Sequence, residues 1–323
     1  MKKQLFIALI TLVPFGKNIH AQWAPIKGTN KSSVLCMAST GSELFAGTMD
    51  KGILSSIDNG ITWKLSNKGL QKGKCNNIEA IVAKKEGVFS VGCSGIFSST
   101  DNGATWKEGN INYTTLLIQS IASKGSMMIV GGYGDGIFIS KDNGKTWKKS
   151  NNGLTDKFVT SVAFGENAIF AGTNKGGFFI STDNGESWVT SNTGLPVAKS
   201  VKSLYVVGNT IYAGTDGGGV NIFSTAPEGD GVYVSTDNGA TWAAANKGIE
   251  KKTVQFISGS GDHVFAVLKS GKLFYYNSKA QAWTEVINDF PKETYVNTVF
   301  MKGTNVYVGT NNGIFLNNTL IIK

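Results

Sequence analysis

The sequence predicts an all-β fold, a seven-bladed β-propeller with four-stranded antiparallel blades. Three features predict it: an eight-residue motif recurs about every 41 residues, all seven Trp residues follow the same period, and so does a short strand that ends in small residues before a Gly turn. Self-similarity at such a period is typical of propellers and solenoids. The chain has 323 residues, 41% of them hydrophobic, which suits one large all-β domain and is too apolar for a disordered chain.

The recurring motif is S-x-D-N-G-x-T/S-W. Its five close copies are Ser56–Trp63, Ser99–Trp106, Ser140–Trp147, Ser181–Trp188 and Ser235–Trp242. A sixth, altered copy ends at Trp283 and has Ser278 in place of the Asp and Ala280 in place of the Gly. Asp accepts hydrogen bonds from the N–H groups of a turn and Gly allows a positive φ, so each copy predicts a tight turn between two strands.

The Trp positions give the number of repeats. They are 23, 63, 106, 147, 188, 242 and 283, with gaps of 40, 43, 41, 41, 54 and 41 residues. The long gap holds about 13 extra residues within 216–230, which predicts a long loop there.

Each repeat predicts four short strands, because alternating apolar residues are separated by Gly, Asn and Asp turns. In the first repeat we expect strands at Val34–Ala38, Leu44–Thr48, Ile53–Ser56 and Ile61–Leu65. No stretch has a convincing helical period. Four strands in each period make the blade of a propeller.

The two ends of the chain are expected to share one blade. The last repeat stops soon after Phe315 without a Trp segment of its own, whereas Trp23 precedes the first complete repeat. We therefore expect the segment around Trp23, near the start of the chain, to be the outer strand of the seventh blade. This strand would close the ring and remove exposed sheet edges.

Residues 1–21 are predicted to be a signal peptide. A basic start is followed by the apolar run Leu5–Phe15, which is too short to span a bilayer, and Ala21 is a small residue before the expected cleavage point. Residues 22–323 then form a single propeller domain. We expect export to the periplasm or the cell exterior, without insertion in a membrane. The mean hydropathy of −0.05 excludes a polytopic membrane protein.

On these motifs the chain resembles the Asp-box (BNR-repeat) propellers, which include sialidases, xyloglucan-degrading enzymes, sortilin-type receptors and photosystem II assembly factors. The resemblance extends from residue 22 to the C-terminus. It implies that the Asp boxes lie on the face opposite the active sites. The five motif carboxylates are interpreted as structural rather than catalytic or metal-binding: Asp58, Asp101, Asp142, Asp183 and Asp237. Because such relatives perform different functions on one scaffold, function has to be argued from the site.

Missing residues exclude several kinds of chemistry. All 31 basic residues are Lys, so the Arg triad of a sialidase is absent, and Lys lacks the planar guanidinium fork. His20 leaves with the signal peptide, and His263 is predicted at a turn on the Asp-box side. The Cys residues lack zinc spacing, and we expect no metal and no cofactor. Gly131–Gly136 and Gly217–Gly219 are predicted to be strand turns rather than phosphate loops, because no helix follows them.

The face opposite the Asp boxes should carry the candidate site. The carboxylates expected there are Asp50, Asp135, Asp156, Asp216, Glu228 and Asp230. Two of them at roughly 5–9.5 Å would make a glycosidase, with Asp135 and Asp216 as weak catalytic candidates. Aromatic faces beside carboxylates suit either a sugar or a protein partner. The predicted ligand-binding set is Tyr113, Tyr133, Asp135, Asp156, Asp216 and Phe223. Ordinary packing of the Tyr residues and a neutral insertion at the long loop remain open alternatives.

The three Cys residues are expected to differ in role. Cys75 precedes the first strand of the second blade and Cys93 follows its second strand, so both should lie on one face and form a disulfide in an exported protein. Cys36, on an inner strand, is expected to be a buried free thiol.

We therefore expect a monomeric, exported, non-catalytic propeller that binds a glycan or an envelope or extracellular protein. A glycoside hydrolase with two carboxylates is one alternative, and an assembly factor for an envelope complex, suggested only by the resemblance, is another. The net charge of +9 suits an anionic partner such as an acidic polysaccharide, or an ordinary solvated surface. Nucleic acid is not expected, because there is no Arg and no clustered basic stripe.

Overall fold

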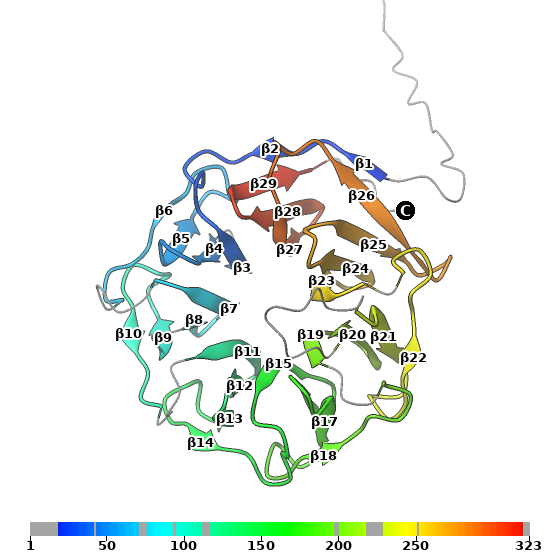
Figure 1. Cartoon of the computed structure of the whole chain (residues 1–323). Coiled ribbons are helices and arrows are strands. Elements are labelled where there is room, and N and C mark those ends of the chain that lie inside the picture. Colours follow the sequence, from blue (N-terminus) through cyan, green and yellow to red (C-terminus); the bar gives the residue numbers. More distant parts are fainter. Residues whose placement is uncertain are drawn as a thin grey trace, which may run out of the picture.

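Seven β-sheets surround a central axis, as the sequence predicts (Figure 1). The computed structural model describes residues 19–41, 43–70, 76–92, 95–111, 117–196, 200–217, 229–250 and 252–318. Within these residues there is no helix. Each sheet contains four antiparallel strands, and the first strand of each repeat lies nearest the axis, so the all-β, seven-bladed prediction is confirmed.

The strands occupy equivalent places from blade to blade. The innermost strands are β3 (Val34–Thr40), β7 (Ile78–Lys84), β11 (Ile118–Lys124), β15 (Val159–Phe164), β19 (Ser200–Val207), β23 (Val254–Ser260) and β27 (Val296–Lys302). The second strands are β4 (Glu43–Thr48), β8 (Gly87–Gly92), β12 (Met127–Gly132), β16 (Ile169–Thr173), β20 (Thr210–Asp216), β24 (His263–Leu268) and β28 (Asn305–Thr310). The third strands are β5 (Ile53–Ser56), β9 (Gly95–Ser99), β13 (Gly136–Ser140), β17 (Phe178–Ser181), β21 (Val232–Ser235), β25 (Leu273–Asn277) and β29 (Gly313–Asn317). The outer strands are β6 (Lys64–Leu65), β10 (Lys107–Glu108), β14 (Lys148–Lys149), β18 (Val189–Thr190), β22 (Ala243–Ala244), β26 (Ala282–Asn288) and β2 (Ala24–Pro25).

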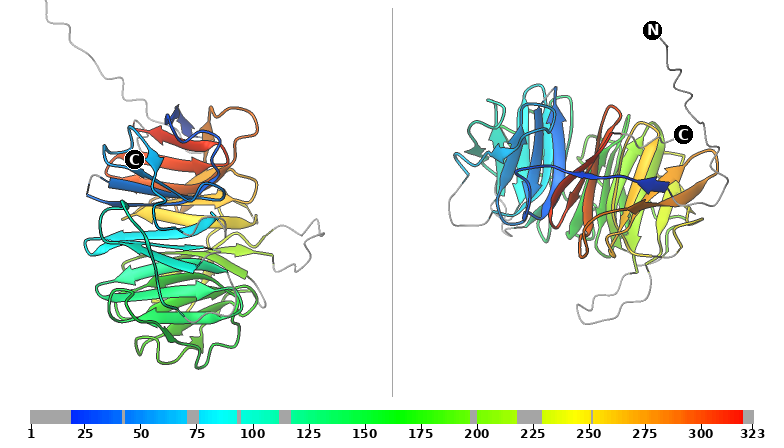
Figure 2. Two further views of the ribbon diagram at one scale, coloured as in Figure 1. Left: turned by 90° about the vertical axis from the view of Figure 1, so that its left-hand side faces the viewer. Right: turned by 90° about the horizontal axis from the view of Figure 1, so that it is seen from above.

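The N-terminal segment closes the ring. Strand β2 pairs with β29, placing Ala24 opposite Leu316, and the Ile26 N–H donates to the Ile314 carbonyl at 2.9 Å. This confirms that blade seven takes its outer strand from the beginning of the chain. A further strand, β1 (Ile19–Ala21), runs parallel to β26 and makes blade six five-stranded (Figure 2).

The hydrophobic core is divided among the blade interfaces. Each cluster of buried side chains combines residues from two neighbouring sheets; Trp188, for example, packs with Ile139 of the preceding blade. Trp23 plays this part between blades six and seven and is 6% exposed. Trp147 is half-buried, and the other Trp residues are buried. The Trp indoles therefore pack between neighbouring sheets around the ring, and Trp147 is the least buried of them.

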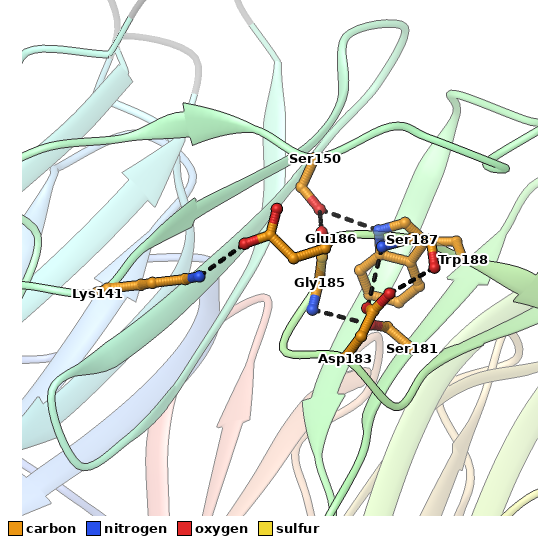
Figure 3. Close-up of polar contacts among 8 residues, drawn as sticks. All are labelled: Lys141, Ser150, Ser181, Asp183, Gly185, Glu186, Ser187 and Trp188. Atoms are coloured by element: carbon orange, nitrogen blue, oxygen red, sulfur yellow. Dashed lines mark hydrogen bonds and ion pairs between the residues drawn. The ribbon is translucent and has the colours of Figure 1, made fainter.

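The Asp boxes are tight turns between the third and outer strands, and Figure 3 shows the one in blade four. Asp183 accepts the backbone N–H of Ser187 at 3.0 Å on one carboxylate oxygen and the Ser187 hydroxyl on the other. Ser181 donates to Asp183 at 2.8 Å and accepts the Gly185 N–H at 2.8 Å. Asn184 adopts the left-handed region, with φ 58°. These hydrogen bonds, the Ser187 hydroxyl first, lower the pKa of Asp183 far below its ordinary value.

The outer strand of the first blade is shorter than the sequence predicts. In the first blade a strand was expected over Ile61–Leu65, but β6 contains only the last two of these residues. Thr62 instead belongs to the Asp-box turn, where its backbone N–H donates to Asp58 at 2.9 Å. The alternating apolar residues favour a strand here, but the hydrogen bonds to Asp58 keep residues 61–63 in the turn.

A second repeated turn, which the sequence analysis missed, follows each outer strand in four blades. Its motif is Asn-x-Gly-Leu/Ile, beginning at Asn67, Asn151, Asn192 and Asn246. The side chain of Asn192 accepts the Phe178 N–H at 2.8 Å and donates to the Gly176 carbonyl at 2.9 Å, so it ties the interblade connection to the loop before β17. Gly194 has φ +88°, and a Cβ added there would lie 2.0 Å from the carbonyl oxygen of Trp242. In these four blades the motif thus holds one blade against the next.

Candidate functional site

The two faces of the ring carry different connections. Because each blade is a meander, the first-to-second-strand hairpins and the Asp-box turns emerge at one end of the sheets. Lys302, the last residue of β27, accordingly donates to Asn59 of an Asp box at 2.9 Å. The second-to-third-strand loops and the interblade connections emerge at the opposite end. We call the inner part of that opposite face, where the innermost strands begin, the mouth.

Exposed apolar side chains gather around the mouth. Leu117, Phe158 and Tyr295 each directly precede an innermost strand and are 43%, 45% and 51% exposed. The carbonyl of each accepts a backbone N–H from the residue after the second strand of the same blade, at 2.8 to 3.1 Å, so the three occupy equivalent positions. Met49, which follows β4, is 55% exposed. With Tyr133, these residues form what we call the mouth patch.

Tyr133 and Phe158 join blades three and four at the mouth. Their ring centroids are 4.8 Å apart with an interplanar angle of 70°, an edge-to-face arrangement, and their backbones form an isolated antiparallel bridge. The Asn174 side chain donates to the Tyr133 hydroxyl at 3.4 Å and accepts from Ser200 at 3.4 Å, which extends the contact to blade five. Tyr133 was predicted from the sequence, whereas Phe158 and Asn174 were not. The sequence offers one signal for Phe158. It is an aromatic residue at a position where blades one and five carry the polar residues Ser33 and Ser200.

The predicted carboxylates of this face interact with neighbouring groups of the fold. Asp156 accepts the backbone N–H groups of Phe158, Lys175 and Gly176 at 3.0, 2.7 and 2.8 Å, so both of its oxygens hold loop backbone. The side chain of Asp135 is 3% exposed and lies 3.6 Å from the Lys149 ammonium. Both residues therefore interact with the fold at this face, and their prediction as ligand-binding residues stays a prediction.

Asp216 lies one blade further around the ring. One of its oxygens is 3.5 Å from the Lys202 ammonium, and the other accepts the Thr253 hydroxyl at 3.4 Å. Asp50 is exposed and Asp230 is half-buried. The predicted residues Tyr113, Phe223 and Glu228, and the expected disulfide partners Cys75 and Cys93, lie outside the described residues.

Three other predicted features are present in the structure: the Gly131–Gly136 turn, the buried Cys36 thiol and the position of His263. Gly131–Gly136 spans the end of β12, a turn and the start of β13, as predicted. Cys36 is a buried free thiol, and its burial raises the pKa well above the ordinary range of a thiol. His263 begins β24 at the Asp-box end, with Nδ1 3.3 Å from the Tyr275 hydroxyl oxygen.

The described part of the chain contains no group of three or more His, Cys, Asp or Glu side chains arranged for a metal ion. Nor does it contain a helix long and apolar enough to cross a membrane.

Comparison with known proteins supports the Asp-box fold. The chain matches the DUF6242 beta propeller domain over residues 151–313 and the BNR/Asp-box repeat over residues 138–149. No curated protein matches it.

Solved structures share the fold at low sequence identity. The extracellular domain of BT4673 from B. thetaiotaomicron has 17% identity and a TM-score of 0.70, with 93% of this chain and 39% of that chain covered. YCF48 bound to D1 peptide has 13% identity and a TM-score of 0.69, covering 93% and 96% of the two chains. The GH74 xyloglucanase from Xanthomonas campestris has 13% identity and a TM-score of 0.72, covering 94% and 54%. The chain therefore spans 39% of one and 54% of another of these structures, and the likeness is one of fold.

Proposed function

The chain belongs to the DUF6242 beta propeller domain family, and on that premise we propose that it is an exported, non-catalytic interaction module whose mouth patch binds a protein ligand. The observation that carries the proposal is the equivalent placement of Leu117, Phe158 and Tyr295, each exposed where an innermost strand begins. The three side chains lie at one register of blades three, four and seven, so all of them are exposed on the same face of the ring, where exposed apolar surface can mark an interaction site.

The chemistry of the mouth patch favours a protein over a glycan. Met49 and Leu117 offer apolar area but no aromatic face on which a sugar ring could stack, and Met and aromatic residues are enriched where proteins bind one another. Phe158 and Tyr133 add an aromatic pair that can act as an anchor. The fold itself is compatible with this use, since the structurally similar YCF48 binds a D1 peptide.

No observation favours a hydrolase to the same degree. A glycosidase needs two carboxylates free to act on one bond. Asp156 uses both oxygens to hold backbone N–H groups, and Asp216 engages Lys202 and Thr253. Their interactions support a structural role for these groups.

Alanine variants on the two faces test the proposal. The double variant Leu117→Ala/Phe158→Ala should retain its fold but bind the ligand from envelope extract about 30-fold less strongly or worse, because apolar anchors contribute about 1–2 kcal/mol each and every 1.4 kcal/mol is tenfold in affinity. The matched control is Ile61→Ala, which changes a side chain 73% exposed in an Asp-box turn. Equal capture by the double variant and the control would contradict the mouth patch as the binding surface.

A glycan array run with the same variants separates the remaining alternative. If the parent and the Ile61→Ala control bind a sugar and the double variant does not, the ligand of the mouth patch is a glycan and not a protein. Mass spectrometry of the exported protein, with an N-terminus at Gln22, would support the proposed localisation, whereas recovery of the uncut chain in the cytoplasm would contradict it.

A further inference from the structure

Seven Asn-Gly dipeptides occur in the chain, and all of them lie within the described residues. Five belong to the Asp boxes, one begins at Asn312, and one begins at Asn152 in the turn after β14. An Asn that precedes Gly can react with the main chain, because Gly has no side chain to shield the N–H group that attacks. The fold therefore decides which of the seven is free to react.

In six of the seven dipeptides the Gly N–H donates a hydrogen bond. The Ser hydroxyl of the motif accepts it in each Asp box, at 2.7 or 2.8 Å, and the Ser32 carbonyl accepts it from Gly313 at 2.8 Å. These six Gly residues are buried or half-buried. Their nitrogens cannot attack until the turn opens locally.

Asn152 and Gly153 differ on both counts. They are the middle residues of a turn in which the Leu154 N–H donates to the Asn151 carbonyl at 3.1 Å and Gly153 has φ +79°. Such a turn is closed by the N–H of its fourth residue, so the N–H of the third is left over. Among the described residues, the Gly153 N–H and the Asn152 side chain have no hydrogen-bond partner, and both residues are exposed.

The equivalent turns of the other blades lack the Asn side chain. They share a Gly with φ between 88° and 93°, but at the position of Asn152 they carry Lys68, Thr193 and Lys247. None of these side chains has a carbonyl carbon that the Gly nitrogen could attack. Of the four Asn-x-Gly turns, the one in blade three alone combines a free Gly N–H with a free Asn amide.

We propose that Asn152 is the deamidation site of the native protein. The Gly153 nitrogen, after losing its proton to base, attacks the side-chain carbonyl carbon of Asn152 and forms a C–N bond. The bond from that carbon to the amide nitrogen breaks, and the nitrogen gains a proton and leaves as ammonia. Water then opens the resulting succinimide ring, which gives isoaspartate if the main-chain carbonyl is attacked and aspartate if the side-chain carbonyl is attacked. The net reaction converts the amide and one water into a carboxylic acid and ammonia.

Isoaspartate at this position would loosen the junction between blades three and four. The Asn152 carbonyl accepts the Trp188 N–H at 2.8 Å, and the adjacent Asn151 side chain accepts the Ile137 N–H at 2.8 Å. In isoaspartate the main chain is one carbon longer, and the carbonyl that accepted the Trp188 N–H becomes part of a side-chain carboxylate. The two anchors can then no longer both keep their present positions.

Peptide mapping by mass spectrometry on the unaltered protein tests the site. In the folded protein at mildly alkaline pH, Asn152 should deamidate about tenfold faster or more than any of the other six, because each of those must first break a hydrogen bond of the fold. In guanidinium chloride all seven should react at similar rates, because the dipeptide is then exposed everywhere. The comparison separates protection by the fold from the reactivity of the dipeptide itself.

Two variants exchange the turns of blades three and four. Asn152→Thr installs the residue that blade four carries, so it should fold and lose the modification at this turn. Thr193→Asn copies blade three into blade four, where Gly194 is also exposed and its N–H has no partner among the described residues, so it should create a second reactive site. During incubation the melting temperature of the parent should fall, whereas that of Asn152→Thr should stay constant.

Three results would overturn the proposal: deamidation of native Asn152 no faster than that of the other six, a Thr193→Asn turn that stays unmodified while Asn152 reacts, or an equal fall in melting temperature for Asn152→Thr and the parent. The first is measured on the unaltered protein, so it decides the question even if a variant does not fold. Binding at the mouth patch enters none of these measurements.

Discussion

The indole Nε1 of Trp188 donates a hydrogen bond to the Ser150 hydroxyl at 3.0 Å, although the two residues belong to neighbouring blades. The same hydroxyl donates to the carbonyl of Gly185 in the Asp-box turn (Figure 3). One serine therefore connects the outer edge of blade three with both the turn and the tryptophan of blade four. The Asp box stabilises the contact between blades as well as its own hairpin.

Removal of this hydroxyl should weaken the ring. Ser150→Ala leaves the Trp188 indole N–H and the Gly185 carbonyl without a partner in a buried place, which costs about 1–3 kcal/mol in the free energy of unfolding. The matched control is Ser90→Ala. Ser90 is fully buried, and within the described residues its hydroxyl has no hydrogen-bond partner, so its loss should be neutral or slightly stabilising. Urea unfolding compares the two, and equal destabilisation would contradict the role of the bridge.

Substitution by Phe should lower stability less at Trp23, where the two chain ends meet, than at Trp188. Trp23 Nε1 is buried with no hydrogen-bond partner among the described residues, whereas Trp188 Nε1 is bonded to Ser150. We expect Trp188→Phe to destabilise by about 1–2 kcal/mol more than Trp23→Phe, because only the former breaks a buried hydrogen bond. Trp23→Ala should cost about 3–5 kcal/mol through the cavity that it leaves. An unchanged melting temperature for Trp23→Ala would contradict closure of the ring by this segment.

Two glycines with positive φ allow two costs of substitution to be compared: the clash of an added Cβ with the next blade, at Gly194, and the left-handed backbone alone, at Gly208. A Cβ at Gly194 would lie 2.0 Å from the Trp242 carbonyl oxygen, whereas at Gly208, with φ +56°, nothing lies within 4 Å. Gly208→Ala should therefore cost only the left-handed conformation, about 1–2 kcal/mol. Gly194→Ala should cost about 3 kcal/mol or more, because the turn must move away from the next blade. Thermal unfolding measures both, and similar values would refute the close approach.

Acid should release the Asp-box turns over a defined range of pH. The Thr146 hydroxyl, then its backbone N–H, lower the pKa of Asp142 to about 2 from an ordinary value near 3.8. A lowered pKa in the folded protein means that the stabilisation is complete above about pH 4 and is lost as the pH falls to about 2. Asp142→Asn should therefore be less stable than the parent at pH 7, and the difference should shrink as the pH falls from about 4 and vanish below about pH 2.

The control for this titration is Glu186→Gln, which removes the surface ion pair with Lys141 at 2.8 Å in the next box. Exposed pairs of this kind contribute little, so its unfolding curve should follow the parent's. A difference between Asp142→Asn and the parent that stays constant from pH 7 to pH 2 would show that the carboxylate charge is not what holds the turn.

Much of the fold is predictable because it is local. The Asp58 carboxylate binds the N–H of Thr62, four residues away, so the turn is recognisable in a single segment. The Asn-x-Gly turn was equally visible, since Asn67, Asn151, Asn192 and Asn246 each stand four residues after a Trp. Its role is not apparent from the local sequence, because the contact that requires Gly194 is with the Trp242 carbonyl of the next blade.

The candidate site was less accessible to prediction. Asp156 stays a predicted ligand-binding residue, and its oxygens receive backbone N–H groups from Lys175 and Gly176, on a loop about 20 residues away. No pattern in the sequence marks that contact. The exposure of Phe158 likewise depends on how Tyr133 packs against it from the preceding blade.

The sequence by itself determined the number of blades and the positions of the Asp-box turns, because each follows from a motif that is satisfied within a few residues and repeated along the chain. It also determined the shared seventh blade, because Trp23 precedes the first complete repeat and the last repeat lacks a Trp segment. Only the tertiary structure decided which side chains face solvent at the mouth, which carboxylates are engaged and which blade has a fifth strand. The physical reason is that burial and hydrogen bonding at those places depend on loops of different blades, which the closed ring alone brings together.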